Sequence, residues 1–170
     1  MPDPFDHQPQ SALDSLVQWI PGFRGYWNRE RRREADQLLR HWLAERLDAA
    51  KRQLDQRARP LADLGQIDLL PQMDRLRGRL DKMVAKVRGA TQGYSGFFDL
   101  AQVDQDRLEE VYQHDVAAID QIDALVALLE SLPSEPRALA DALPELAAKI
   151  AEAEKQWNRR DEILRGMTEV

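Results

Sequence analysis

Four long segments of this chain place apolar residues at alternating steps of three and four. The clearest runs from Leu69 to Val87, where the apolar positions are separated by 4, 3, 4, 3 and 4 residues. Such spacing lines one face of an α-helix and packs it against neighbouring helices, as in coiled coils. The period-two alternation that marks a half-buried strand is absent. We therefore predict an all-α fold, an antiparallel up-and-down helical bundle with long coiled-coil-like helices and a short N-terminal amphipathic helix.

Prolines and glycines between the apolar segments set the expected helix boundaries. Pro21 and Gly22 end the short first helix, Pro60 ends the next and Gly89 ends the third. Pro144 lies inside the last segment, where it either kinks the helix or divides it in two, and we favour a kink. The expected organisation is a disordered tail at residues 1–10 and one domain at 11–170, with helices at about 11–20, 28–59, 67–88, 103–132 and 135–165.

Composition excludes several classes of protein. The chain has 170 residues and no cysteine, which rules out a disulfide framework, an iron–sulfur cluster and cysteine-based zinc sites. The first ten residues lack the basic and apolar regions of a signal peptide, and no apolar stretch is long enough to span a membrane. A net charge of −6 argues against nucleic acid as the main partner. We expect a cytoplasmic protein.

One six-residue motif occurs twice. Residues 22–27 (GFRGYW) and 93–98 (GYSGFF) both read glycine, aromatic, any residue, glycine, aromatic, aromatic. The two copies hold 4 of the 8 glycines of the chain and 6 of its 11 aromatic residues. Because successive helices of an up-and-down bundle alternate in direction, both copies should lie at the same end.

Two interpretations of this aromatic-rich end remain open, and they can coexist. The rings can form a buried plug that closes the core, with glycines that permit positive φ and close backbone approach. Alternatively, they can form an exposed tip that binds a partner protein or enters a membrane interface. Trp157 should approach the same end. The aromatic candidates for the site are Trp19, Phe23, Tyr26, Trp27, Tyr94, Phe97 and Phe98.

A basic run follows the first motif and completes the candidate site. Bases at a helix N-terminus oppose the helix dipole, so an acidic surface would stabilise them. That surface is either the expected helix at 103–132, since residues 99–135 carry 10 acidic residues and one basic residue, or an external partner. Aromatic residues beside a basic cluster are also typical of peripheral membrane attachment. The basic candidates are Arg24, Arg29, Arg31, Arg32 and Arg33.

Known catalytic motifs are absent from the sequence. It holds no Walker A motif, dinucleotide fingerprint, Ser/His/Asp spacing or HExxH. His41 and His114 each stand one helical turn from a glutamate, but two ligands do not make a metal site. We expect no cofactor, no metal and no enzymatic activity. Asp115, the polar position of an otherwise apolar segment, should set helix register by pairing with Arg107 or an arginine of helix 67–88.

The motifs resemble those of an uncharacterised family of bacterial helical proteins. Residues 19–36 (WIPGFRGYWNRERRREAD), the following LLR at 38–40 and residues 93–99 (GYSGFFD) are similar to the PGxxGY…RRxxDxLLR and YGYSGFFD-like segments of that family. The similarity covers roughly residues 18–125. Phe23 stands where tyrosine is usual, and Gln92 stands where tyrosine is common. The resemblance implies no activity, cofactor or catalytic residue, only that these segments are a signature.

Together these observations predict a non-catalytic helical scaffold or adaptor of the bacterial cytoplasm. It would bind a partner protein through its aromatic-rich end. The alternative is a peripheral membrane-associated protein anchored by residues 11–33. We expect no nucleic-acid partner. A homo-oligomer stays open, because apolar seams that pack within one chain can also form a dimer.

Overall fold

The computed structural model describes residues 11–89 and 96–167, and every regular element within these ranges is a helix. The α-helices are α1 (Ala12–Trp19), α2 (Arg32–Ala58), α3 (Leu70–Arg88), α4 (Gln105–Glu130) and α5 (Pro136–Gly166). The short 3-10 turns are η1 (Arg29–Arg31), η2 (Arg59–Leu61), η3 (Ile67–Leu69) and η4 (Phe97–Asp99). The predicted all-α bundle is confirmed. The tail predicted at residues 1–10 lies outside the described residues.

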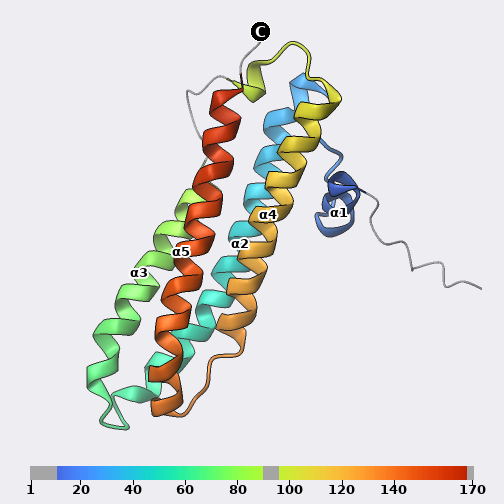
Figure 1. Ribbon diagram of the computed structural model, residues 1–170. Helices are drawn as coiled ribbons and strands as arrows, with labels where there is room; N and C mark the ends of the chain where they lie inside the picture. Colours follow the sequence, from blue (N-terminus) through green and yellow to red (C-terminus); the bar gives the residue numbers. More distant parts are fainter. Residues whose placement is uncertain (1–10, 90–95, 168–170) are drawn as a thin grey trace, which may run out of the picture.

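Figure 1 shows α2, α3, α4 and α5 as four long helices in which the chain reverses direction from each to the next. α2 packs mainly against α3, and α4 packs mainly against α5. α2 also contacts α4, and α1 lies outside the four long helices against α4. The α2–α3 and α4–α5 connections therefore share one end of the bundle. Residues 20–31 and 96–104 share the other.

The periodic apolar residues of the sequence are the buried faces of these helices. Leu39, Leu43 and Leu47 of α2 are fully buried, as are Leu125 and Leu129 of α4. Burying one such side chain contributes about 1.5–3 kcal/mol relative to leaving it exposed. The apolar core therefore runs along the length of the bundle and holds the helices in register.

Side-chain caps fix where three helices begin. The Ser11 hydroxyl accepts a hydrogen bond from the backbone N–H of Asp14 at the start of α1. Asp104 caps α4 in the same way, and both carboxylate oxygens of Glu135 accept N–H groups in the first turn of α5. Each cap satisfies backbone donors that have no partner within the helix, an effect of about 1 kcal/mol.

α5 continues through Pro144 as one helix of 31 residues. Proline lacks the N–H that would bond to the preceding turn, and its ring crowds the carbonyl there. Pro144 is exposed, so the carbonyl group that loses its helical partner lies on the solvent side of the helix. The division into two helices, one of the two outcomes expected from the sequence, does not occur.

Candidate functional site

Both copies of the repeated motif contribute rings to one cluster where α2 begins. Phe23 and Phe97 each lie edge-on to Tyr26 with ring centroids 5.3 Å away, and Phe98 lies 5.7 Å from Phe97. Tyr112 of α4 stacks on Tyr26 at 5.5 Å. All five rings are buried, so they close this end of the core. Tyr94 of the second copy lies outside the described residues.

Arg32 joins the two copies through their backbones. Its Nε donates to the carbonyl of Tyr26 at 2.8 Å, and its Nη1 donates to the carbonyls of Phe97 at 3.3 Å and Leu100 at 2.7 Å. Buried carbonyls require donors, and here one guanidinium supplies three. Arg32 is 2% exposed. The expectation that it forms part of a basic binding surface is therefore wrong.

All three described glycines of the motif have positive φ, as the pattern indicated, and at two of them a side chain would also clash with neighbouring atoms. Gly25 has φ +87°, and a Cβ there would lie 2.6 Å from the hydroxyl oxygen of Tyr112. That hydroxyl accepts the backbone N–H of Tyr26 at 2.9 Å. Gly96 has φ +99°, and a Cβ there would lie 2.5 Å from the carbonyl oxygen of Leu164. Both positions exclude a side chain by conformation and by space.

A buried group of charges lies directly beneath the rings. The Tyr26 hydroxyl donates to Asp115 at 2.6 Å, and Arg160 Nε donates to the other oxygen of that carboxylate at 2.5 Å. Arg160 belongs to α5, so the expected pairing of Asp115 with Arg107 or an α3 arginine is wrong. The physical reason is that α4 packs mainly against α5, which brings the two buried faces together.

Two further carboxylates complete this buried network. Arg160 Nη2 donates to Asp36 at 2.7 Å, and Arg40 Nε donates to the second oxygen of Asp36, also at 2.7 Å. Arg40 also donates to Asp161 at 2.9 Å. The ring of Trp157 lies 5.0 Å from both guanidinium carbons. Trp157 thus lies among the charges of the network, with Arg40 and Arg160 as its cation partners.

The pKa directions follow from burial and from the number of partners. Burial alone would raise the pKa of Asp36, but Arg160 and Arg40 together hold it below its usual value. Burial raises the pKa of Asp115 despite Arg160 and the Tyr26 hydroxyl. Burial would lower the pKa of Arg160, yet Asp115 and Asp36 hold it well above its usual value. For Arg160, the attraction of two carboxylates outweighs the effect of burial and favours the charged form. For fully buried Asp115, one guanidinium does not outweigh burial, so the neutral form is favoured.

Sequence reasoning identified Asp115 but missed the residues that surround it. Arg160 stands in the apolar segment of α5, and Asp36 extends that of α2 by one further step from Leu39. A charged residue at a core position on one helix requires an opposite charge on another. This signal could have found Arg160 and Asp36. Arg40 and Asp161 lie beside the apolar positions and carried no such signal.

A groove of about 440 Å³ opens on the outside of the same end, between residues 22–28 and the first turns of α2. Trp27 is 57% exposed at this groove, whereas Phe23 is buried. The side chains that line it include Phe23, Arg24, Trp27, Arg31, Glu34, Ala35 and Leu38. We call it the loop–α2 groove. Its lining combines apolar side chains with a few charged ones, which is typical of ligand and peptide sites.

Four of the five predicted bases are exposed. Arg33 lies over the ring of Phe98 and bonds to Asp99 at 3.2 Å. Among the described residues no ion pair joins Arg24, Arg29 or Arg31 to a carboxylate. Arg24 and Arg31 border the loop–α2 groove, so their charges are available to a partner.

α1 is docked rather than free. Its Leu16 and the following Ile20 are fully buried, while Val17 is 49% exposed and Trp19 is 37% exposed. The apolar face of this short helix is already used by the bundle.

Comparison with known protein families, with curated proteins and with solved structures finds no match to this chain. The likeness to a bacterial helical family therefore stays a resemblance between motifs. Within residues 11–89 and 96–167, no three His, Asp or Glu side chains are placed to share a metal ion. No described helix is both long and apolar enough to cross a membrane. The arrangement combines an exposed groove with a buried network of charges that links α2, α4 and α5.

Proposed function

We propose that this protein is a non-catalytic helical scaffold or adaptor that binds a partner protein through the loop–α2 groove. The observation that carries the proposal is Trp27, a large aromatic side chain exposed at an apolar groove beside Arg24 and Arg31. Tryptophan and arginine are enriched among the residues that dominate binding energy at interfaces. The rigid aromatic cluster beneath would hold the groove in one shape, which reduces the entropic cost of binding.

A membrane surface is the competing partner. The exposed Val17, Trp19 and Trp27 together with the basic residues favour it. Two features favour a protein instead. α1 has its apolar face against the bundle, and a concave groove suits a protruding side chain better than a lipid surface. Co-sedimentation with anionic vesicles tests this alternative, and Trp27-dependent binding to them would replace the protein partner with a membrane.

Selection from a displayed random-peptide library tests the proposed function. Peptides enriched on the wild-type protein should carry an aliphatic or aromatic anchor beside acidic residues. Trp27→Ala should weaken binding of a selected peptide about 30-fold, the effect of a 2 kcal/mol hot spot. Arg75→Ala is the control, because Arg75 is exposed on α3 and does not line the groove. Equal affinity of both variants for every selected peptide would refute the groove as the binding site.

A further inference from the structure

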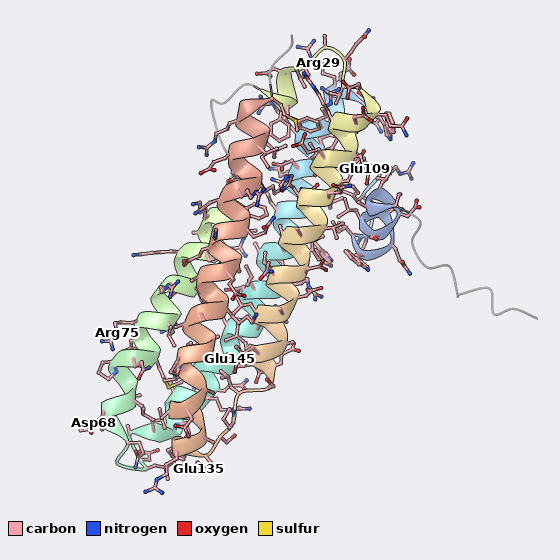
Figure 2. All side chains as sticks on the ribbon, in the orientation of Figure 1. Arg29, Asp68, Arg75, Glu109, Glu135 and Glu145 are labelled. Atoms are coloured by element: carbon pink, nitrogen blue, oxygen red, sulfur yellow. The ribbon has the colours of Figure 1, made fainter. Side chains whose placement is uncertain are left out.

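Exposed large apolar side chains are few in the described residues, and they fall at three places. Val17 and Trp19 lie on α1, Trp27 lines the loop–α2 groove, and Leu64 and Ile67 belong to the α2–α3 connection. Figure 2 labels Arg29 and Asp68 at opposite ends of the bundle. The four long helices α2, α3, α4 and α5 themselves carry none of these side chains. Exposed apolar residues that lie together, rather than scattered singly, mark surfaces for association.

The connection that carries Leu64 and Ile67 is an ordered turn. The N–H of Leu64 bonds to the carbonyl of Pro60 at 3.0 Å, and the N–H of Gln66 bonds to the carbonyl of Leu61 at 2.8 Å. Leu61 is fully buried and anchors the turn, while Leu64 is 57% exposed and Ile67 is 61% exposed. A folded turn that keeps two aliphatic side chains in solvent forms a preformed convex surface.

Charge distinguishes this turn from the groove. Asp63 directly precedes Leu64 and Asp68 directly follows Ile67, and both carboxylates are exposed. Arg59 is the base within residues 59–68, so the turn is acidic on balance. We call residues 63–68 the α2–α3 tip. Its aliphatic pair between two acids is complementary to the apolar side chains of the groove and to Arg24 and Arg31, which outnumber the lining acid Glu34.

We propose that the occupant of the loop–α2 groove is the α2–α3 tip of a second copy of this chain. The inference rests on the proposed function, because it assigns a partner to the same groove. Leu64 and Ile67 of one copy would cover Trp27 and Leu38 of the next. Asp63 and Asp68 would then approach Arg24 and Arg31. Every copy carries both surfaces, so no other component is required.

The two surfaces lie on different parts of the molecule, so the contact is head-to-tail. Such heterologous contacts leave one free groove and one free tip on every growing assembly, which then extends or closes into a ring. An isologous dimer, in which the same surface meets itself, would stop at two copies. The tip is small, so each contact belongs to the weak class of interfaces and assembly should depend on protein concentration.

Two variants test this geometry by complementation. Trp27→Asp disrupts the groove as a binding surface and leaves the tip intact. Ile67→Asp disrupts the tip and leaves the groove intact. In sedimentation velocity up to about 1 mM, the wild type should form species larger than a dimer, and each variant alone should be a monomer. Mixing the two variants should give a one-to-one dimer and nothing larger, because one intact groove meets one intact tip. Circular dichroism should show that both variants remain folded.

Three results would overturn the inference: a wild type that is monomeric at every concentration, assembly of either variant alone, or no dimer in the mixture.

The proposed function is tested separately from self-assembly, so either one can be rejected while the other is kept. A monomeric wild type that still binds a selected peptide through Trp27 would reject self-assembly and keep the groove as a site for another protein. If neither peptide binding nor self-assembly depends on Trp27, both proposals are rejected. Anionic vesicles that bind the wild type but not Trp27→Asp, with no self-assembly, would assign the groove to a membrane.

Discussion

Among single residues, Arg160 makes the contacts on which the buried network depends. It is fully buried and bonds to Asp115 and Asp36, which come from α4 and α2. A buried ion pair costs desolvation that its mutual attraction about offsets when the geometry is good, so its net contribution to stability is small. Removing one partner is different, because it leaves a buried charge without compensation.

We therefore expect Arg160→Met to lower the free energy of unfolding by about 3–5 kcal/mol, because Asp115 loses its only guanidinium. Urea denaturation followed by circular dichroism measures this change. Arg159→Met is the matched control, since Arg159 is the exposed neighbour on the same helix and should change stability by less than about 0.5 kcal/mol. A loss below about 1 kcal/mol for Arg160→Met would mean that the network contributes little.

The glycine of the second motif gives another prediction for a single residue. Gly96→Ala should lower the free energy of unfolding by at least about 1–3 kcal/mol, because φ is +99° and the new Cβ would meet the backbone carbonyl of Leu164. Gly78→Ala in α3 should instead stabilise by about 0.5–1 kcal/mol, because a Cβ there meets nothing within 4 Å. Thermal unfolding compares the two. Similar shifts of the same sign would contradict the close approach at Gly96.

Among the elements, α1 differs from the other helices. It has 8 residues, too few for a stable isolated helix, so its order depends on docking against α4. Leu16 and Ile20 supply that docking, and both are fully buried. α1 should therefore behave as a unit that opens separately from the long helices.

Leu16→Ala should release α1 while the bundle stays intact, since truncating a buried leucine costs about 2–5 kcal/mol at its site. Hydrogen exchange read by mass spectrometry should speed up in residues 12–19 and stay unchanged in α3. Val17→Ala is the control, because Val17 is 49% exposed. Equal acceleration in α3 and α1 would show that α1 belongs to the cooperative core.

For the whole molecule, Tyr26 couples stability to pH. Burial raises the pKa of Tyr26 well above 10.0, and the negative charge of Asp115 is the second cause of this increase. The folded state therefore keeps a proton that the unfolded chain releases above pH 10.0. Its contribution to stability is fully present below that pH and is lost as the pH rises toward the raised pKa.

Tyr26→Phe lacks this titrating group and keeps Tyr112, whose pKa is also raised by burial. The free energy of unfolding of the wild type should fall more steeply above pH 10.0 than that of Tyr26→Phe. Urea denaturation on both sides of that pH gives the two profiles. Parallel profiles would contradict a raised pKa for Tyr26 in the folded state.

The location of the candidate site was partly predictable. The repeated motif indicated that Phe23, Tyr26 and Phe97 share one end, and helix direction alone was sufficient for that inference. The outward position of Trp27 and the inward position of Arg32 were not predictable, because each depends on which loop carbonyls and rings occupy the space nearby. Of the five arginines predicted from the basic run, Arg32 is therefore buried and joins the two motif copies, and the other four are exposed.

The sequence by itself determined the helices, their apolar faces and the alternating directions of the bundle, because helical periodicity and proline or glycine stops act over a few neighbouring residues. Only the tertiary structure decided that Asp115 pairs with Arg160, that Arg32 is buried, and that Trp27 borders a groove. Those outcomes depend on the relative height and rotation of segments far apart in the chain. Packing of the whole core sets that height and rotation.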